Sequence, residues 1–157
     1  MPPAYEAAAA TGDGGRLALD DPGGAASAYA TAPVFPAANG GLVSTLGEYL
    51  TFARMLRSGG VHAGRLLPSD GVVRRMTTNQ LTPSVLAASP AAGVFLGDSG
   101  WGMGVGVTPD GRFGWAGYGT SFSVDPASGR ILLLATQRMP PSTELIADVD
   151  ALEGTAS

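Results

Sequence analysis

The chain has 157 residues, of which 45% are hydrophobic, and this is enough for one domain with a core of its own. Its formal net charge is −4 and it has no cluster of basic residues, so we expect no nucleic-acid partner. The sequence contains no cysteine, which excludes disulfides, thiol catalysis and thiolate metal sites.

The hydropathy of the sequence predicts no segment that crosses a membrane. No stretch approaches the roughly 18 consecutive apolar residues of a transmembrane helix. The opening residues MPPAYE lack the basic region and the apolar core of a signal peptide. We therefore expect no membrane span and, by default, a cytoplasmic location, and we expect neither a cofactor nor a metal site.

Residues 1–36 carry repeated turn signals between short segments. GDGG and DDPGG are turns, and only RLAL alternates as a strand does. We predict that residues 1–36 form a loosely structured arm or a weak hairpin. The paired carboxylates Asp20 and Asp21 are expected to lie on a solvated surface, as are Asp148 and Asp150, which makes both pairs poor candidates for acid–base catalysis.

Two amphipathic helices are predicted after this arm. The first covers about residues 45–58, where Ser44 and Thr45 offer N-caps and Glu48 completes a capping box. Its apolar residues recur at helical spacing, namely Leu46, Tyr49, Leu50, Ala53 and Leu56. A second, shorter helix is expected from just after Asp70 to about Thr77.

Residues 82–99 show no usable period and contain Pro83 and Pro90, so we expect a long loop there. Such a loop either forms the rim of a site or is a disordered segment of variable length. The residues alone do not separate these alternatives.

Four strands and a closing helix are predicted in the remaining sequence. The strands are residues 101–107, 112–116, 120–125 and 130–136, at hairpin spacing. ILLLA in the last of them is a continuous apolar run, which is typical of a central strand. The closing helix covers about residues 142–152, with Leu145, Ile146, Val149 and Leu152 on one face. This order of helix, loop, antiparallel strands and helix indicates an α+β fold.

The most unusual segment is GWAGYGT, residues 114–120. Its glycines flank bulky residues, so the backbone is bare where another group can approach its N–H donors. An alternation of glycine with aromatic residues is also a common packing device, in which glycine makes room for a neighbouring ring. Taken alone, the segment is compatible with both interpretations.

Three segments resemble, in the same order, those of the serine β-lactamase-like hydrolases, the family of class C β-lactamases, D-alanyl-D-alanine carboxypeptidases and related esterases. They are GGLVST leading into YLTFARML, RLLPS followed by RMT, and residues 111–138. The resemblance covers residues 39–157 well and the preceding residues loosely. It implies that residues 37–157 are the C-terminal part of a β-lactamase/transpeptidase-like domain, with an antiparallel sheet and covering helices, and that the half carrying the nucleophile is absent.

The resemblance also assigns roles to four residues of the GWAGYGT segment. In the family, a motif of Lys, His or Trp, a small residue and Gly lies on the strand beside the active site, and the next backbone N–H helps to form the oxyanion hole. Trp115, Ala116 and Gly117 resemble this motif and would contact the substrate, and the backbone N–H of Tyr118 would be the catalytic donor. The segment is one residue shorter than the family's Trp-Gly-Gly version, which leaves the register of the donor open.

The chain lacks the residues that would activate a nucleophile. The family's serine lies in a Ser-x-x-Lys motif, but all nine basic residues here are arginine, which does not deprotonate in proteins. The single histidine, His62, lies in a glycine-rich turn and is expected to be an exposed loop residue. We therefore expect the chain to be inactive alone.

Two alternative functions follow from the resemblance. In the first, the chain is the C-terminal fragment of a serine hydrolase of the esterase or carboxypeptidase type, and it contributes the oxyanion-side strand to an acyl-enzyme mechanism. Its partners would be the missing N-terminal half and a small ester or amide substrate. In the second, the chain is a catalytically silent, β-rich binding or interaction module. The family handles β-lactams, D-Ala-D-Ala peptides and esters, and the absence of a Lys-Thr-Gly motif favours esters.

Overall fold

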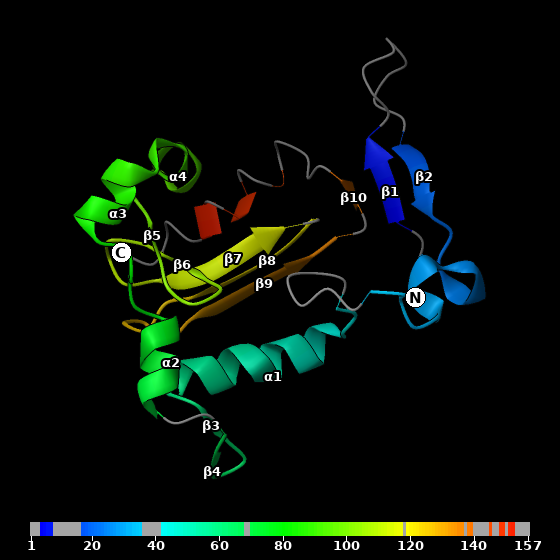
Figure 1. The fold of residues 1–157 in the computed structure, drawn as a ribbon. Helices are drawn as coiled ribbons and strands as arrows, with labels where there is room; N and C mark the ends of the chain where they lie inside the picture. The colour runs from blue at the N-terminus through cyan, green and yellow to red at the C-terminus, as the bar shows by residue number, and fades with distance from the viewer. Residues whose placement is uncertain are drawn as a thin grey trace. The chain divides into compact units, whose positions relative to one another are not determined.

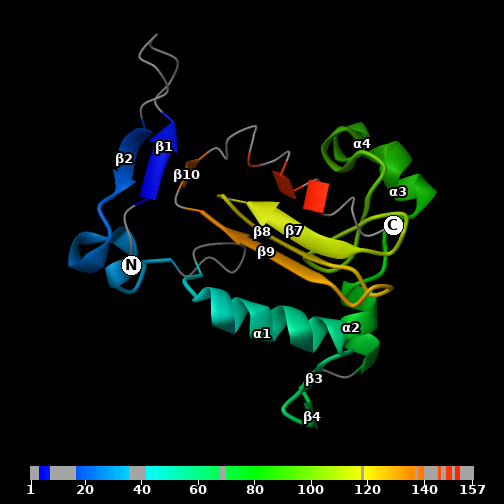
Figure 2. The same ribbon diagram turned by 180° about the vertical axis from the view of Figure 1, so that it is seen from behind.

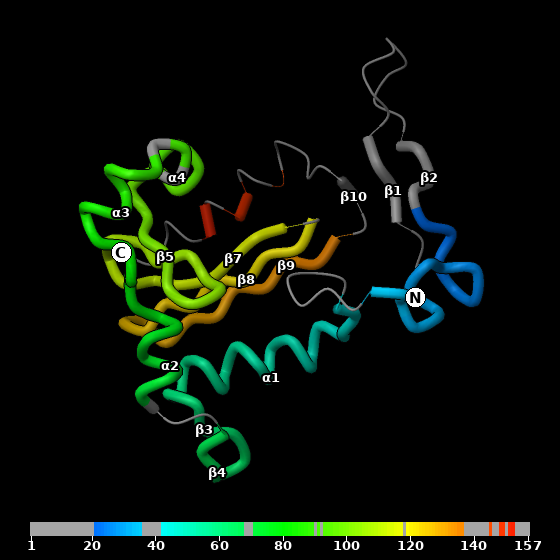
Figure 3. Tube along the Cα trace, in the orientation of Figure 1, coloured from blue at the N-terminus to red at the C-terminus, as the bar shows by residue number. Residues whose placement is uncertain are grey.

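The structure is a computed structural model, drawn as a ribbon in Figure 1 and as a Cα tube in Figure 3. It describes residues 4–7, 17–35, 42–67, 70–117, 119–136, 138–139, 145, 148–149 and 151–152. The chain divides into two compact units, the first of residues 1–45, 117–120 and 134–157 and the second of residues 46–116 and 121–133.

Strands, α-helices and two short 3-10 helices make up the regular structure of the described residues. In chain order they are β1 (Ala4–Ala7), β2 (Leu17–Asp21), η1 (Gly24–Ala26), η2 (Ala28–Ala30), α1 (Leu46–Arg57), β3 (Val61–His62), β4 (Arg65–Leu66), α2 (Asp70–Met76), α3 (Pro83–Ala88), α4 (Pro90–Leu96), β5 (Gly100–Trp101), β6 (Gly106–Val107), β7 (Phe113–Gly117), β8 (Thr120–Val124), β9 (Ile131–Ala135) and β10 (Arg138–Met139). In the described part of the chain, strands β5 to β9 follow one another without an intervening helix and helices α1 to α4 precede them, which agrees with the predicted α+β class.

A five-stranded sheet has the order β5-β6-β7-β8-β9. β6 pairs antiparallel with both β5 and β7, and Val107 lies opposite Gly100 on one side and Phe113 on the other. β7, β8 and β9 confirm three predicted strands with small differences at their ends. Among the described strands, however, β9 lies at the edge of this sheet, so the prediction of a central strand is wrong. Its apolar run reflects packing, since Ile131 and Leu133 lie against the core, and packing does not determine strand order.

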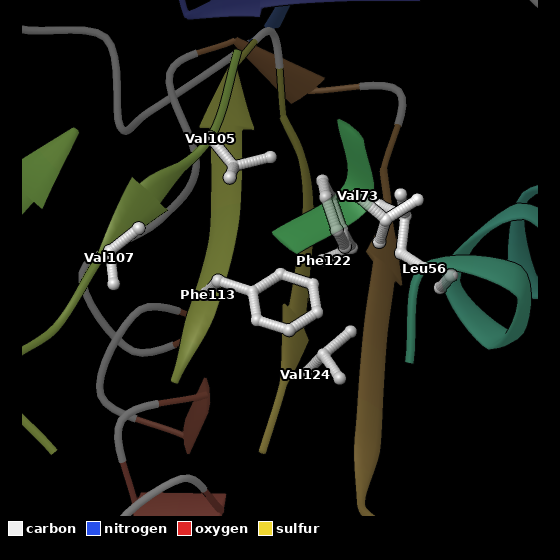
Figure 4. Packing of buried hydrophobic residues seen from close by; sticks show 8 residues of the cluster. Leu56, Val73, Val105, Val107, Phe113, Phe122 and Val124 are labelled. Carbon is white, nitrogen blue, oxygen red and sulfur yellow. The ribbon is translucent and has the colours of Figure 1, made fainter. Parts of the chain in front are cut away.

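The core of the second unit joins the sheet to helices α1 and α2. Phe113 from β7 and Phe122 and Val124 from β8 lie close to Leu56 of α1 and Val73 of α2 (Figure 4), and each of the five is at most 6% exposed. Full burial of such a side chain contributes about 1.5–3 kcal/mol. Figures 1 and 2 show α1 running along the sheet beside β9 from opposite sides of the molecule.

Helices α1 and α2 confirm the two helices predicted from apolar periodicity. The buried residues of α1 are Ala53 and Leu56, three positions apart on one helical face. In the last turn of α1, Arg57 donates from Nη1 to the carbonyl of Gly129 in the turn between β8 and β9. A cation is favourable at a helix C-terminus, and this hydrogen bond ties the end of α1 to the sheet.

Residues 82–99 are largely helical, so the predicted loop is wrong. Helices α3 and α4 both have a proline in their first turn, where the missing N–H would have no helical partner. The hydroxyl of Thr82 caps α3 by accepting a hydrogen bond from the N–H of Val85 at 3.4 Å. Pro83 and Pro90 therefore begin helices here, whereas the prediction treated them as helix breakers.

Residues 101–107 were predicted to form a single strand, and this is also wrong. They contain the end of β5, a turn and strand β6. β5 and β6 pair across a turn in which Gly104 has a φ of 86° and the N–H of Gly102 donates to the carbonyl of Val105 at 2.8 Å. Gly102 also lies against the end of α2, because a Cβ there would be 1.8 Å from the carbonyl oxygen of Met76. The glycines in this segment thus serve a turn and a close backbone approach.

The first unit contains a three-stranded sheet with the order β10-β1-β2. β1 pairs antiparallel with β2 and parallel with β10, and β10 was not predicted from the sequence. Of the predicted closing helix, the structure describes Leu145, Asp148, Val149, Ala151 and Leu152, all of which are helical. Ile146 and the predicted start of this helix lie outside the described residues.

Candidate active site

Strand β7 carries three of the four residues to which a site role was assigned from the sequence. Exposure increases along the strand, because Phe113 is 4% exposed within the core and Trp115 is 39% exposed. Ala116 and Gly117, the last two residues of β7, are exposed. The strand therefore leads from the core to an accessible end, where a substrate carbonyl can approach the backbone.

Two glycines of β7 differ in the space that the structure leaves for a side chain. A Cβ on Gly114 would be 2.0 Å from the carbonyl oxygen of Phe122, so the fold itself requires glycine there. A Cβ on Gly117 would meet no described atom within 4 Å, and Gly117 does not adopt a positive φ. Packing against the described residues thus explains Gly114 but not Gly117, which is the difference expected if Gly117 leaves room for a ligand.

Trp115 belongs to an aromatic cluster that we define as Phe95, Trp101 and Trp115. Its ring centroid lies 4.5 Å from that of Trp101 at an interplanar angle of 89°, and 5.5 Å from that of Phe95 at 52°. Gly106 makes room for the ring, since a Cβ there would be 3.5 Å from Cε3 of Trp115. Edge-to-face pairs contribute about 0.5–1.5 kcal/mol beyond area burial. The packing alternative thus holds for one side of Trp115, while the exposed remainder of the residue is available to a ligand.

Tyr118 lies outside the described residues, so the predicted role of its backbone N–H stays a prediction. The residues on either side of it are described and hydrogen-bonded. The hydroxyl of Thr120 donates to the carbonyl of Gly117 at 2.7 Å, and Thr136 donates to the carbonyl of Gly119 from its N–H at 2.9 Å and from its hydroxyl at 2.8 Å. These threonines were not singled out from the sequence, because nothing in the residues around them indicates a role.

Asp21 was predicted to lie on a solvated surface, but this is wrong, because the residue is buried with an exposed fraction of 6%. Its carboxylate accepts hydrogen bonds from the N–H groups of Ala28 at 2.9 Å and Gly23 at 2.8 Å. These bonds, the one from Ala28 above all, hold the pKa of Asp21 below its usual value because they stabilise the charged form. Asp21 therefore organises a turn, and a carboxylate held ionised in this way is a poor general acid.

His62 is exposed, as predicted, and lies on strand β3 opposite Arg65 of β4. The two strands are joined by Ala63 and Gly64, which both have a positive φ, as two-residue hairpin turns require. Among the described residues no group of three His, Asp or Glu side chains could hold a metal ion. None of the described helices combines the length and the apolar character needed to cross a membrane.

A model of a known protein family matches nearly the whole sequence. The family model described as Beta-lactamase matches residues 2–156. The chain belongs to the beta-lactamase family. This match confirms the resemblance that was drawn from three short segments of the sequence.

Two relatives of this chain come from Mycobacterium tuberculosis. They are Uncharacterized protein MT1414 of strain CDC 1551 / Oshkosh and Protein Rv1367c of strain ATCC 25618 / H37Rv, each 35% identical to this chain over 126 residues. The matched region covers 71% of this chain and 31% of each relative. The chain thus spans about a third of the length of these relatives.

Solved structures of Simvastatin Synthase (LovD) from Aspergillus terreus share the fold. The unliganded enzyme matches with a TM-score of 0.60 and 18% identity, over 94% of this chain and 38% of LovD. The LovD9 mutant matches with a TM-score of 0.61 and 19% identity, over the same shares. At this level of identity the likeness shows the fold alone, and it confirms the predicted β-lactamase-like fold.

Proposed function

We propose that the chain forms the oxyanion side of a serine hydrolase active site, and that the serine and its base come from a partner part corresponding to the N-terminal half of the domain. Membership of the beta-lactamase family supports the reaction class. The observation that carries the proposal is the end of β7, where Gly117 is exposed and lacks a side chain although the described residues leave room for one.

The reaction would proceed through an acyl-enzyme. The serine oxygen attacks the carbonyl of a small ester or amide, and the carbonyl oxygen becomes an oxyanion in a tetrahedral intermediate. The intermediate collapses with loss of the alcohol or amine, and water later releases the acid. The backbone N–H of Tyr118, following the end of β7, would donate to the oxyanion, and a rigidly placed donor of this kind contributes about 3 kcal/mol.

The requirement for a partner part follows from the chemistry of the available bases. A serine needs a neighbouring group that accepts its proton. The chain has no lysine, its arginines stay protonated, and His62 lies on the exposed β3–β4 hairpin. The substrate is a small ester or amide, and the missing Lys-Thr-Gly motif favours the ester.

The test compares the purified chain with a mixture of the chain and a nucleophile-bearing N-terminal part from the beta-lactamase family. We expect the chain alone neither to hydrolyse p-nitrophenyl butyrate nor to react with a fluorophosphonate probe. In the mixture we expect hydrolysis, with the probe attached to a serine of the N-terminal part. Stoichiometric labelling of a serine in this chain would contradict the proposal, and a complex without hydrolysis would favour the silent module.

A further inference from the structure

The aromatic cluster presents an accessible surface on the second unit. Phe95 comes from α4, Trp101 from β5 and Trp115 from β7, so three separate elements bring the rings together. Phe95 is 70% exposed although it contacts Trp115, and its neighbour Val94 is 89% exposed. Large apolar side chains that are both exposed and gathered around a structured ring are typical of a binding surface.

The chemistry of this surface is uncharged. Helix α4 and strands β5 and β7 contain no ionisable side chain, and residues 76–97 contain none either. Protein surfaces ordinarily mix charged side chains of both signs, so this stretch is unusual. The first charged residue after α4 is Asp98, an exposed carboxylate that would repel an anionic ligand. A ligand that carries a carboxylate therefore finds no cationic partner on these elements, whereas a neutral apolar group loses nothing by binding there.

One ring of the cluster lies on the same strand as the proposed reaction site. Trp115 lies two residues before Gly117 on β7, which corresponds to about 7 Å along a strand. A short acyl chain spans this distance from a carbonyl at the end of β7. The other apolar occupant of such a surface is a second copy of the chain, which would cover the cluster without regard to the reaction.

We propose that Phe95 and Trp115 bind the apolar acyl chain of an uncharged ester and that Phe95 determines the chain-length preference of the site. This inference rests on the function proposed above and names its substrate class. Trp115 forms the base of the acyl subsite, held in place by Trp101. Phe95 forms its outer wall, and its exposure allows the wall to be altered without disturbing the core.

The full chain tests this through its own fluorescence, because its two tryptophans, Trp101 and Trp115, both belong to the cluster. The probes are methyl esters of straight-chain acids from butanoate to octanoate, with the corresponding free carboxylates as charged counterparts. We expect the dissociation constant of the ester to fall about fourfold with each added methylene, the effect of burying one such group. We expect the carboxylates to bind at least about tenfold more weakly.

Two variants separate the subsite from general surface hydrophobicity. Phe95→Ala should abolish the dependence on chain length, and Phe95→Leu should retain part of it. Val94→Ala, which removes an exposed apolar neighbour that does not take part in the ring contacts, is the matched control and should retain the full dependence. Far-UV circular dichroism of each variant checks that α4 persists.

Several outcomes would overturn the inference. They are ester binding without chain-length dependence, carboxylates that bind as tightly as esters, and equal effects of Phe95→Ala and Val94→Ala. Loss of self-association in Phe95→Ala by sedimentation velocity, with unchanged ester binding, would assign the surface to a second copy of the chain. The fluorescence titration measures binding of the ester to the chain and does not depend on hydrolysis. Chain-length-dependent binding together with an inactive reconstituted enzyme would therefore contradict the proposed function alone.

Discussion

Gly114 and Gly117 lie three residues apart on β7, and the structure leaves room for a side chain only at Gly117. Gly114 faces the backbone of β8, and Gly117 faces open space among the described residues. Gly114→Ala should therefore lower the free energy of unfolding by about 1–3 kcal/mol, because the added methyl forces the strands apart. Gly117→Ala should change it by less than about 0.5 kcal/mol. Urea unfolding of the two variants measures this difference, and equal losses would assign both glycines to packing.

Asp125 illustrates how a turn carboxylate links stability to pH. It accepts hydrogen bonds from the hydroxyl and N–H of Ser128 and from the N–H of Ala127, the last at 2.8 Å. The Ser128 hydroxyl above all holds the pKa of Asp125 below its usual value of 3.8. A lowered folded-state pKa means that the stabilisation is present above the unfolded-state pKa and is lost as the pH falls through the folded-state value.

The corresponding experiment follows unfolding of Asp125→Ala and of the unaltered chain from pH 7 down to pH 2. We expect the variant to be less stable near neutral pH and the difference to shrink once the pH falls below about 4. Asp98→Ala, at an exposed carboxylate after α4, is the control. A difference that grows as the pH falls would contradict the assigned sign.

The misassignment of Asp21 shows what local sequence cannot reveal about a single residue. DDPGG was predicted to be a turn, whereas in the structure it ends β2 and leads into η1, and the carboxylate of Asp21 accepts a hydrogen bond from the N–H of Ala28, seven residues away. Only the two short helices η1 and η2 return the chain to the carboxylate. A polar turn and a buried anchor have the same composition, so the sequence indicates the turn and not its depth.

At the scale of elements, the spacing of apolar residues predicted the helix and strands that pack on the core. The prediction failed in segments where a glycine or proline is compatible with two different structures. Helix α1 and strands β7 to β9 have clear apolar patterns and were predicted. Pro83 and Pro90 indicate a helix break or a helix start, and the start is the role they have in α3 and α4. The glycines of residues 101–107 fit either a strand or a hairpin, and contact with Met76 of α2, a tertiary feature, accompanies the hairpin.

The sheet order leads to an expected pattern of amide hydrogen exchange. β8 has a neighbouring strand on each side and contributes the buried Phe122 and Val124, whereas β9 is an edge strand of this sheet among the described residues. β8 amides should therefore exchange most slowly, β9 amides faster, and those of the exposed helix α4 faster still. Exchange followed by mass spectrometry tests this order. Slower exchange in β9 than in β8 would contradict the edge assignment.

At the scale of the whole molecule, three short segments in a fixed order were enough to predict the family and its fold. The proposed site was predictable only in part, because its residues come from elements of different kinds. Trp115, Ala116 and Gly117 lie on a strand with a recognisable motif, whereas Phe95 lies on a helix that was predicted to be a loop. Contacts such as that of Phe95 with Trp115, twenty positions apart, arise from tertiary packing and leave no periodic signal in the sequence.

The central claim is that the end of β7 supports an oxyanion, and turnover of the reconstituted enzyme with Gly117→Val tests it most directly. The branched side chain would occupy the space in which the carbonyl oxygen must lie within about 3 Å of the backbone donor. We expect kcat to fall about 100-fold or more while the Tm changes by less than about 2 °C, and we expect Tyr118→Phe to leave kcat nearly unchanged because the donor is the backbone. A Gly117→Val enzyme that melts normally and turns over at nearly the unaltered rate would contradict the claim.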